Sequence, residues 1–369
     1  MNRRVLPIGQ GNFVIEKFSD FTAVFDCGSK TDIGLVHGEI DKNFFDNERI
    51  DVVFISHLDY DHINGIDYLI SKCSVKCIVI PYLEKESVLI SYLYSSVFNV
   101  STNKSSFLSF IYNHTIEFDG YISNYENIRI IQIPSLADDN FKSDLDEINL
   151  GYYNFVINLM SLINKLNPDW LFLPFNYDSK TRSKQFDKAI KSDPDLADLS
   201  IYDLSKNWND PTKDYVNKLK KIFKSKKITG SINDNSMVIY SGPIKRKYNE
   251  LYFVNDGLFH RISCNCSKNE IGAIYMGDYS ANKISYYNEF LKFYNQYINY
   301  VGLIIVPHHG SKSSYNVNLP IDFNSIFLIS YGSTYSYSCD YLVLKDILAK
   351  GRRIILVNEK SAVFEQIIL

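Results

Sequence analysis

The chain lacks several features that mark particular classes of protein. Its 369 residues include 39 lysines and arginines against 42 aspartates and glutamates, a net charge of −3. This balance excludes a global basic field and argues against tight coating of nucleic acid, but it is compatible with a local basic patch. The six cysteines form no Cys-x-x-Cys pair and a chain of this size needs no disulfides, so we expect a reducing compartment.

Long apolar runs are also missing. The longest runs, such as residues 301–306, are far too short to span a bilayer, and the first seven residues lack the apolar run of a signal peptide. We therefore expect a cytoplasmic protein without membrane contact. No internal repeat or low-complexity linker divides the chain. Its hydrophobic content of 46% and charged content of 22% are ordinary for a globular protein.

The order of the predicted elements indicates an α/β protein. Strand-like runs occur at residues 13–18, 21–25, 51–56 and 76–81, and the first two are expected to form a hairpin. A helical pattern at 65–71 separates the last two of these runs, and this strand–helix–strand order is typical of an α/β core. Strand and helix patterns return after residue 235 and continue to the end of the chain.

Residues 83–228 have a different, mostly helical pattern, with helices expected at 88–98 and 152–166. We expect them to form an insertion or cap between the two halves of a core, residues 1–82 and 229–369. Two strand-like runs, 128–133 and 170–174, also lie in this region. Its segment 213–227 carries seven lysines, which could steer a polyanion, although a solvated helix face is the common alternative.

A dense cluster of metal-binding residue types follows the predicted strand at 51–56. His57, Asp59, Asp61 and His62 lie within six residues. Two imidazoles and two carboxylates at this spacing can converge on one or two divalent ions. A solvated polar loop is the alternative, but four such residues so close together are rare in an ordinary turn.

Other motifs occur before and after this cluster. They are Pro7-Ile-Gly-Gln-Gly11, Val24-Phe-Asp-Cys-Gly28, Asn235-Ser-Met-Val-Ile239, Met276-Gly-Asp278 and Pro307-His-His-Gly-Ser-Lys-Ser-Ser314. Together with the cluster they resemble, in order, the motifs of metallo-β-lactamase-fold hydrolases. The closer resemblance is to the metallohydrolase domain of ComEC-type competence proteins, in which Asp replaces the second His of His-x-His-x-Asp-His. It covers about residues 1–82 and 229–369.

The resemblance implies an αββα sandwich with a large, mostly helical insertion and a binuclear metal centre. The implied ligands are His57 and Asp59 for one ion, Asp61, His62 and His309 for the other, Asp278 as a bridge, and Asn235 as a weak or indirect ligand. His309 is preferred to His308 because the family ligand lies directly before glycine. His308 would face the substrate or protonate a leaving group, and it joins Asp61 and Asp278 as a predicted catalytic residue.

Two departures from the common motif affect the expected metal. Asp59 and Asn235 replace imidazoles with oxygen ligands, which favours Mn²⁺ or Mg²⁺ over exclusive Zn²⁺. We expect two divalent ions, manganese or zinc, with magnesium as a further candidate. Asp26 either orients the ligand loop or serves a simple turn before Gly28.

Three further residues are predicted to bind the substrate. Gln10 lies between two glycines of the first motif, and Ser311 and Lys312 follow the histidine pair. A tight turn and a solvated loop are the respective alternatives.

The resemblance to ComEC-type domains implies hydrolysis of a phosphodiester in nucleic acid or a nucleotide, a reaction suited to two metal ions. The same fold also serves other ester and amide hydrolases, so that activity remains an alternative. A non-catalytic subunit of a multiprotein complex, for example in defence against phage, is the second alternative. A protein partner would then dock through residues 83–228.

Overall fold

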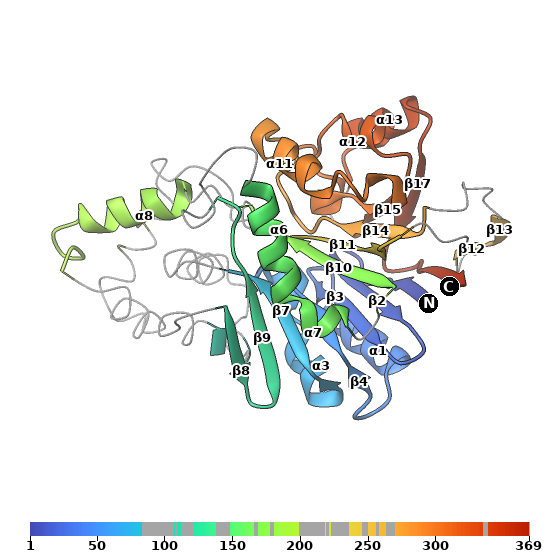
Figure 1. Cartoon of the computed structure of the whole chain (residues 1–369), viewed down its shortest axis with the longest axis horizontal. Coiled ribbons are helices and arrows are strands. Elements are labelled where there is room, and N and C mark those ends of the chain that lie inside the picture. The colour runs from blue at the N-terminus through green and yellow to red at the C-terminus, as the bar shows by residue number, and fades with distance from the viewer. Residues whose placement is uncertain are drawn as a thin grey trace.

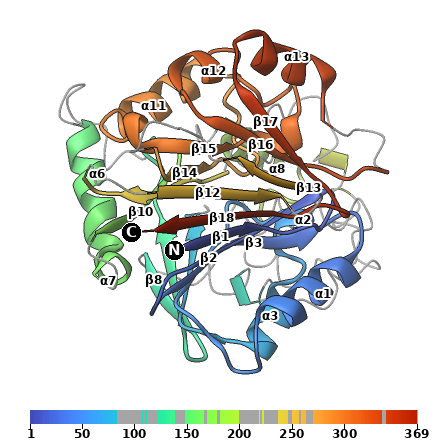
Figure 2. The ribbon, with the colours of Figure 1, turned by 90° about the vertical axis from the view of Figure 1, so that its right-hand side faces the viewer.

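A computed structural model of the chain has two β-sheets packed face to face between layers of helices (Figure 1). The structure describes residues 1–82, 107, 110–111, 121–137, 148–165, 169–177, 181–198, 218, 221–222, 236–245, 250–255, 258–262, 270–334 and 339–368. Figure 2 shows the four layers edge-on, with α11 (Ile284–Tyr294), α12 (Leu319–Asp322) and α13 (Tyr341–Ala349) above the sheets and α1 (Ile33–Asn43) and α3 (Ile66–Lys72) below them.

The larger sheet has ten strands within the described residues. Their order is β13 (Leu258–Ile262), β12 (Glu250–Asn255), β18 (Val363–Ile368), β1 (Asn2–Val5), β2 (Gly11–Lys17), β3 (Thr22–Ser29), β5 (Val52–Phe54), β7 (Cys77–Pro81), β9 (Ile128–Ile133) and β8 (Ile122–Tyr125). β2 and β3 form the hairpin that the sequence predicted, and β3, β5, β7 and β9 run parallel. A separate parallel pair joins β4 (Arg49–Ile50) to β6 (Ser74–Val75).

The smaller sheet has six described strands. Their order is β10 (Trp170–Phe175), β11 (Val238–Pro243), β14 (Gly272–Tyr275), β15 (Val301–Ile305), β16 (Ile326–Ser330) and β17 (Arg353–Val357). The last four strands run parallel, whereas β10 and β11 are antiparallel. All residues of β11, β14 and β16 are buried, as expected for strands covered on both faces.

Helices cover the outer face of each sheet. On the larger sheet these are α1 (Ile33–Asn43) and α3 (Ile66–Lys72), and on the smaller sheet α11 (Ile284–Tyr294), α12 (Leu319–Asp322) and α13 (Tyr341–Ala349). Asp32 caps α1 by accepting a hydrogen bond from the amide of Gly34. Val36 and Ile40 of α1 then lie on one helix face and join the apolar cluster beneath the larger sheet.

A buried ion pair of the larger sheet is hydrogen-bonded to the smaller sheet inside the sandwich. Nε of Arg3 donates to Oε1 of Glu16 at 2.7 Å, and both side chains are essentially inaccessible to solvent. From the smaller sheet, the hydroxyl groups of Tyr275 and Ser241 donate to Glu16 at 2.7 and 2.6 Å. These hydrogen bonds offset the desolvation of the two charges and fix how the sheets face each other.

The range predicted as an insertion also supplies strands to both sheets. β9 pairs with β7 in the larger sheet, and β10 pairs with β11 in the smaller one. The insertion boundaries at 82 and 229 therefore do not coincide with the limits of the sheets. Both strands are short and apolar. The free energy gained by burying them between the layers outweighs the helical preference of the sequence around them.

Helices do occupy other parts of this range. They are α6 (Ile148–Leu159), α7 (Ser161–Asn164) and α8 (Thr181–Lys191). The helix predicted at 88–98 and most of the lysine-rich segment 213–227 lie outside the described residues. Among those that are described, no helix is long and apolar enough to cross a bilayer.

Candidate metal centre

The candidate centre lies where parallel strands of both sheets end. His57 follows β5, and the short helix α2 (Tyr60–Ile63) holds Asp61 and His62. From the smaller sheet, Asp278 follows β14, and the 3₁₀ turn η4 (Pro307–Gly310) follows β15. The carboxyl ends of parallel strands are where α/β folds gather ligand-binding residues, so residues distant in sequence meet here.

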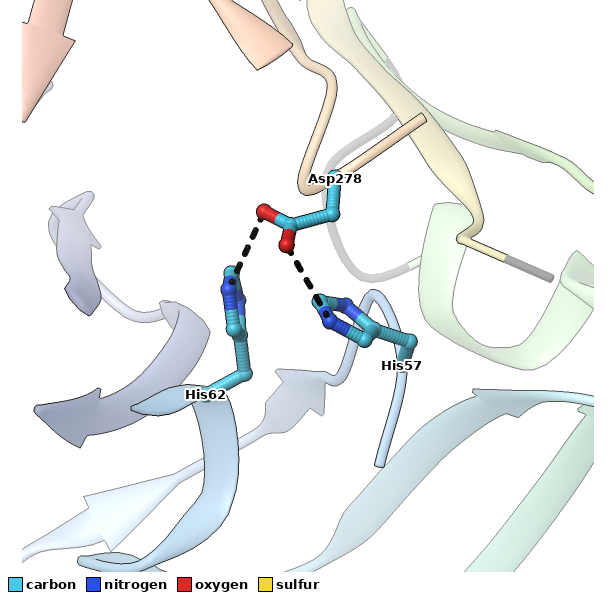
Figure 3. Close-up of side chains that lie close together, drawn as sticks. All are labelled: His57, His62 and Asp278. Carbon is cyan, nitrogen blue, oxygen red and sulfur yellow. Dashed lines mark ion pairs between the residues drawn. The ribbon is translucent and has the colours of Figure 1, made fainter. Parts of the chain in front are cut away.

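The side chains of His57, His62 and Asp278 face one another (Figure 3). Oδ1 of Asp278 lies 3.3 Å from Nε2 of His62, and Oδ2 lies 3.7 Å from Nε2 of His57. The two imidazole rings have centroids 4.1 Å apart, and all three residues are buried. One carboxylate thus presents one oxygen to each ring, an arrangement suited to a ligand between two ions.

A second group, Asp61, His62 and His309, shares His62 with the first. The Nδ1 atom of His309 lies 3.0 Å from the carbonyl oxygen of Ser330, which can only accept, so Nδ1 carries the hydrogen. Its Nε2 atom lies 3.2 Å from Oδ2 of Asp61. Ligand atoms of Asp61, His62 and His309 all lie within 4.8 Å of one another, close enough to hold one ion.

Asp26 supports the ligand cluster through contacts with His62 and Ser56. Its carboxylate lies 2.8 Å from Nδ1 of His62 and accepts hydrogen bonds from the amide and hydroxyl of Ser56 and from Asn12. The partners of Asp26 lower its pKa although burial opposes this, and Asp26 in turn raises the pKa of His62 against burial. This carboxylate–histidine pair is typical of the support behind a metal ligand.

Backbone conformation at the centre is unusual. Asp26, His308 and His309 all have φ values between 51° and 53°, the left-handed region that residues other than glycine seldom adopt. Each such residue costs about 1–3 kcal/mol, so the surrounding structure must impose it. Gly277 also has a positive φ, and a Cβ atom there would lie 2.5 Å from Ser56. Close packing of the two sheet ends therefore places Asp278 opposite His57.

The electrostatics of His57 suit metal ligation. Burial lowers the pKa of His57 to about 3, so its imidazole is neutral at neutral pH. Burial and then the neighbouring Asp61 raise the pKa of Asp59 to about 7. The Nε2 atom of His57 is buried and makes no hydrogen bond with any described residue. A neutral, unpartnered ring nitrogen beside carboxylates is an appropriate ligand for a divalent ion.

The amino-terminal half of this centre matches a known family model. The metallo-beta-lactamase superfamily model matches residues 8–94, a range that includes Asp26 and the whole segment from His57 to His62. The match agrees with two packed sheets between helical layers. The chain has the metallo-β-lactamase fold. This confirms the predicted αββα class, whereas the ComEC-type branch stays a prediction.

Two solved structures are similar to this chain, one over a small part of it and the other over nearly its whole length. MEM-A1, a subclass B3 metallo-beta-lactamase from a soil metagenome library, has 16% identity and a TM-score of 0.20 over 23% of this chain and 32% of its own. The metallo-beta-lactamase fold protein YhfI from Bacillus subtilis has 10% identity and a TM-score of 0.39, over 99% of this chain and 100% of its own. No curated protein sequence matches the chain.

The metallo-β-lactamase fold places most predicted ligands close together. His57, Asp59 and Asp278 lie on one side, since Nε2 of His57 is 3.8 Å from Oδ2 of Asp59 and 3.7 Å from Oδ2 of Asp278. His309 lies on the other side, beside Asp61. Asn235 lies outside the described residues.

The histidine pair divides into a buried and a partly exposed residue. His309 has 6% of its side chain exposed and faces Asp61, whereas His308 has 32% exposed. Nε2 of His308 lies 3.6 Å from Oδ2 of Asp278, and its Nδ1 lies 3.0 Å from the hydroxyl of Ser314. His308 thus occupies the solvent side of the cluster, where a substrate would approach.

The predicted substrate-binding residues have other contacts. The side-chain oxygen of Gln10 is buried and accepts a hydrogen bond from the amide of Gly332. The Ser311 hydroxyl lies 2.8 Å from that of Ser313, and Lys312 is exposed beside them. Contact of any of these with a substrate stays a prediction.

Sequence reasoning missed Lys30 and Ser56. Nζ of Lys30 lies 2.8 Å from Oδ1 of Asp61, and Ser56 links Asp26 to the rings of His57 and His62. Their positions gave a partial signal, because Ser56 directly precedes the cluster and Lys30 lies four residues after Asp26. The sequence pattern carried no sign that the Lys30 side chain turns toward Asp61.

Proposed function

We propose that this chain is a metal-dependent hydrolase that cleaves phosphodiester bonds in nucleic acid or a nucleotide. The observation that carries the proposal is the pair of overlapping ligand groups that share His62. Two adjacent ions suit phosphoryl transfer, because together they can contact both the attacking and the leaving oxygen. The resemblance to ComEC-type domains supports the same substrate class.

The donor set favours ions that accept oxygen ligands. Asp59, Asp61 and Asp278 supply carboxylates, and His57, His62 and His309 supply imidazoles. Such mixed sets bind Mn²⁺ as well as Zn²⁺, while Mg²⁺ prefers still more oxygen. When bound, the ions would supply Lewis acidity and a nucleophilic water at neutral pH. We expect Mn²⁺ to support activity, and activity with Zn²⁺ alone would contradict this part of the proposal.

Residues of the chain have distinct roles in this proposal. Asp278 and Asp61 hold the centre together, and Asp26 fixes the orientation of His62. His308 lies at the solvent side, and its ring is kept in place by Ser314. In the tautomer in which Ser314 donates to Nδ1, Nε2 of His308 carries a hydrogen that it can donate to the leaving oxygen.

A substrate panel tests the proposal. Bis-p-nitrophenyl phosphate, nitrocefin and p-nitrophenyl acetate would be assayed with the metal-loaded protein, with an Asp61→Ala/His62→Ala variant and with a His37→Ala control. His37 is a half-buried histidine that stacks on Tyr68, outside the centre. We expect hydrolysis of the phosphodiester alone, lost in the double variant by at least about 100-fold and retained in the control.

The same panel separates the alternatives. Preferred hydrolysis of nitrocefin or the acetate would indicate another hydrolase of this fold. If metal content and biological effect both survive the loss of Asp61 and His62, the chain is a non-catalytic subunit and the proposal is wrong.

A further inference from the structure

The buried centre has two partly exposed side chains at its solvent side. Lys30 has 34% of its side chain exposed and His308 has 32%. The side chains of the other described residues of the centre are at most 11% exposed, which is the value for Asp59. A substrate that approaches the buried ligands therefore meets Lys30 and His308 first.

Contacts of both the backbone and the side chain of Lys30 hold its ammonium group near the predicted ligands. Its backbone amide donates to the carbonyl of Gln10, in the turn before β2, at 2.6 Å. Its ammonium group lies 2.8 Å from Oδ1 of Asp61, while the other oxygen of Asp61 faces His309 at 3.2 Å.

Lys30 and a metal ion compete for the same carboxylate. An ion held by Asp61, His62 and His309 would take over the charge of Asp61 that now pairs with Lys30. Two divalent ions would more than neutralise the carboxylates of Asp59, Asp61 and Asp278. The loaded centre would then keep a net positive charge, with the ammonium group of Lys30 at its entrance.

We propose that Lys30 binds the anionic group of the substrate at the loaded centre. The inference rests on the proposed function and specifies it, because a phosphodiester carries a negative charge on the group that is cleaved and a simple carboxylic ester does not. A lysine ammonium is a compact, flexible point charge that serves as a phosphate ligand. Lys30 is therefore a residue that selects phosphorylated substrates over neutral ones.

The test measures phosphate binding, not turnover. Inorganic phosphate would be titrated calorimetrically into the Mn²⁺-loaded wild type and into Lys30→Met, Lys30→Arg and Lys17→Met variants. Lys17 is a matched control, since its side chain is 33% exposed and its ammonium group pairs with Glu48 at 2.6 Å. Both residues lie outside the candidate centre. The Mn²⁺ affinity of each variant would be measured separately without phosphate.

We expect Lys30→Met to weaken phosphate binding by about 10- to 100-fold, the effect of losing one charge-assisted hydrogen bond. Lys30→Arg should keep most of the affinity, and Lys17→Met should keep all of it. Mn²⁺ should bind Lys30→Met at least as tightly as wild type, because a competing cation has left Asp61. A purely structural role of Lys30 would instead weaken Mn²⁺ binding.

The outcomes separate the two proposals. Equal phosphate affinity in wild type and Lys30→Met would overturn the role of Lys30 and leave the phosphodiesterase proposal intact. If the loaded wild type binds no phosphate, the phosphodiesterase proposal itself is contradicted.

Discussion

The Nδ1 atom of His62 lies 2.8 Å from the carboxylate of Asp26, and this contact turns Nε2 of the same ring toward Asp278. Asp26 is in turn anchored by the amide and hydroxyl of Ser56, directly before His57. One buried carboxylate therefore positions both ends of the His57–His62 segment. The centre depends on this support as much as on its ligands.

Asp26→Asn should lower metal affinity by about 10- to 100-fold, the usual effect of losing a carboxylate behind a histidine ligand. Competition against a chelating dye would measure it. Asp51→Asn is the matched control, because Asp51 is also a buried carboxylate that accepts a backbone amide, that of Thr22, but lies outside the centre. Equal metal affinities for the two variants would contradict the positioning role of Asp26.

Gly28→Ala should both destabilise the fold and reduce metal affinity. A Cβ atom at Gly28 would lie 2.6–2.8 Å from backbone atoms of Asp61, His62 and Ile63, which cannot move without displacing ligands. Gly38→Ala is the control, since its Cβ would meet nothing within 4 Å in the interior of α1. We expect that control to stabilise the protein by about 0.5–1 kcal/mol in urea unfolding. Unchanged metal binding in Gly28→Ala would contradict the close packing.

The sequence predicted those parts of the centre that are local along the chain. The predicted ligands His57, Asp59, Asp61 and His62 lie on one strand end and one helical turn, so their spacing alone indicated a cluster. The Gly277–Asp278 pair and the histidines before Gly310 were likewise recognisable as short motifs. The hairpin of β2 and β3 was predicted for the same reason, because alternation and turn residues are local signals.

The rest depends on contacts between distant segments. Lys30 meets Asp61 only because β3 and β5 are parallel neighbours whose ends lie side by side. β9 and β10 join separate sheets, although each is surrounded by mostly helical sequence. Periodicity gives the type of an element and not its partner, so the boundary of the insertion could not be read from the chain.

Arg3→Met should lower the free energy of unfolding by about 3–5 kcal/mol, because it leaves Glu16 charged and buried between the sheets. Asp187→Ala, which removes an exposed i,i+4 pair with Lys191 in α8, should change it by less than about 1 kcal/mol. Urea unfolding would measure both. A similar small effect for both variants would mean that the inter-sheet network does not hold the layers together.

Cys73 and Cys77 should react slowly with iodoacetamide in the folded protein. Burial raises the pKa of Cys73 to about 11 and that of Cys77 to about 12. At pH 8 only about one Cys73 thiol in a thousand is then ionised, and the thiolate is the reactive form. Peptide mapping should find both residues labelled quickly in urea, with native labelling that rises with pH. Fast native labelling at pH 8 would contradict their burial.

The most direct test of a binuclear hydrolytic centre is metal reconstitution of the chelator-treated protein. Mn²⁺ would be added stepwise while bound ions, melting temperature and bis-p-nitrophenyl phosphate hydrolysis are measured on the same sample. We expect saturation at two ions per chain, a higher melting temperature, and hydrolysis that appears as the ions bind, with all three effects lost in Asp278→Asn. Full hydrolysis by the chelator-treated protein, or by Asp278→Asn, would contradict the account.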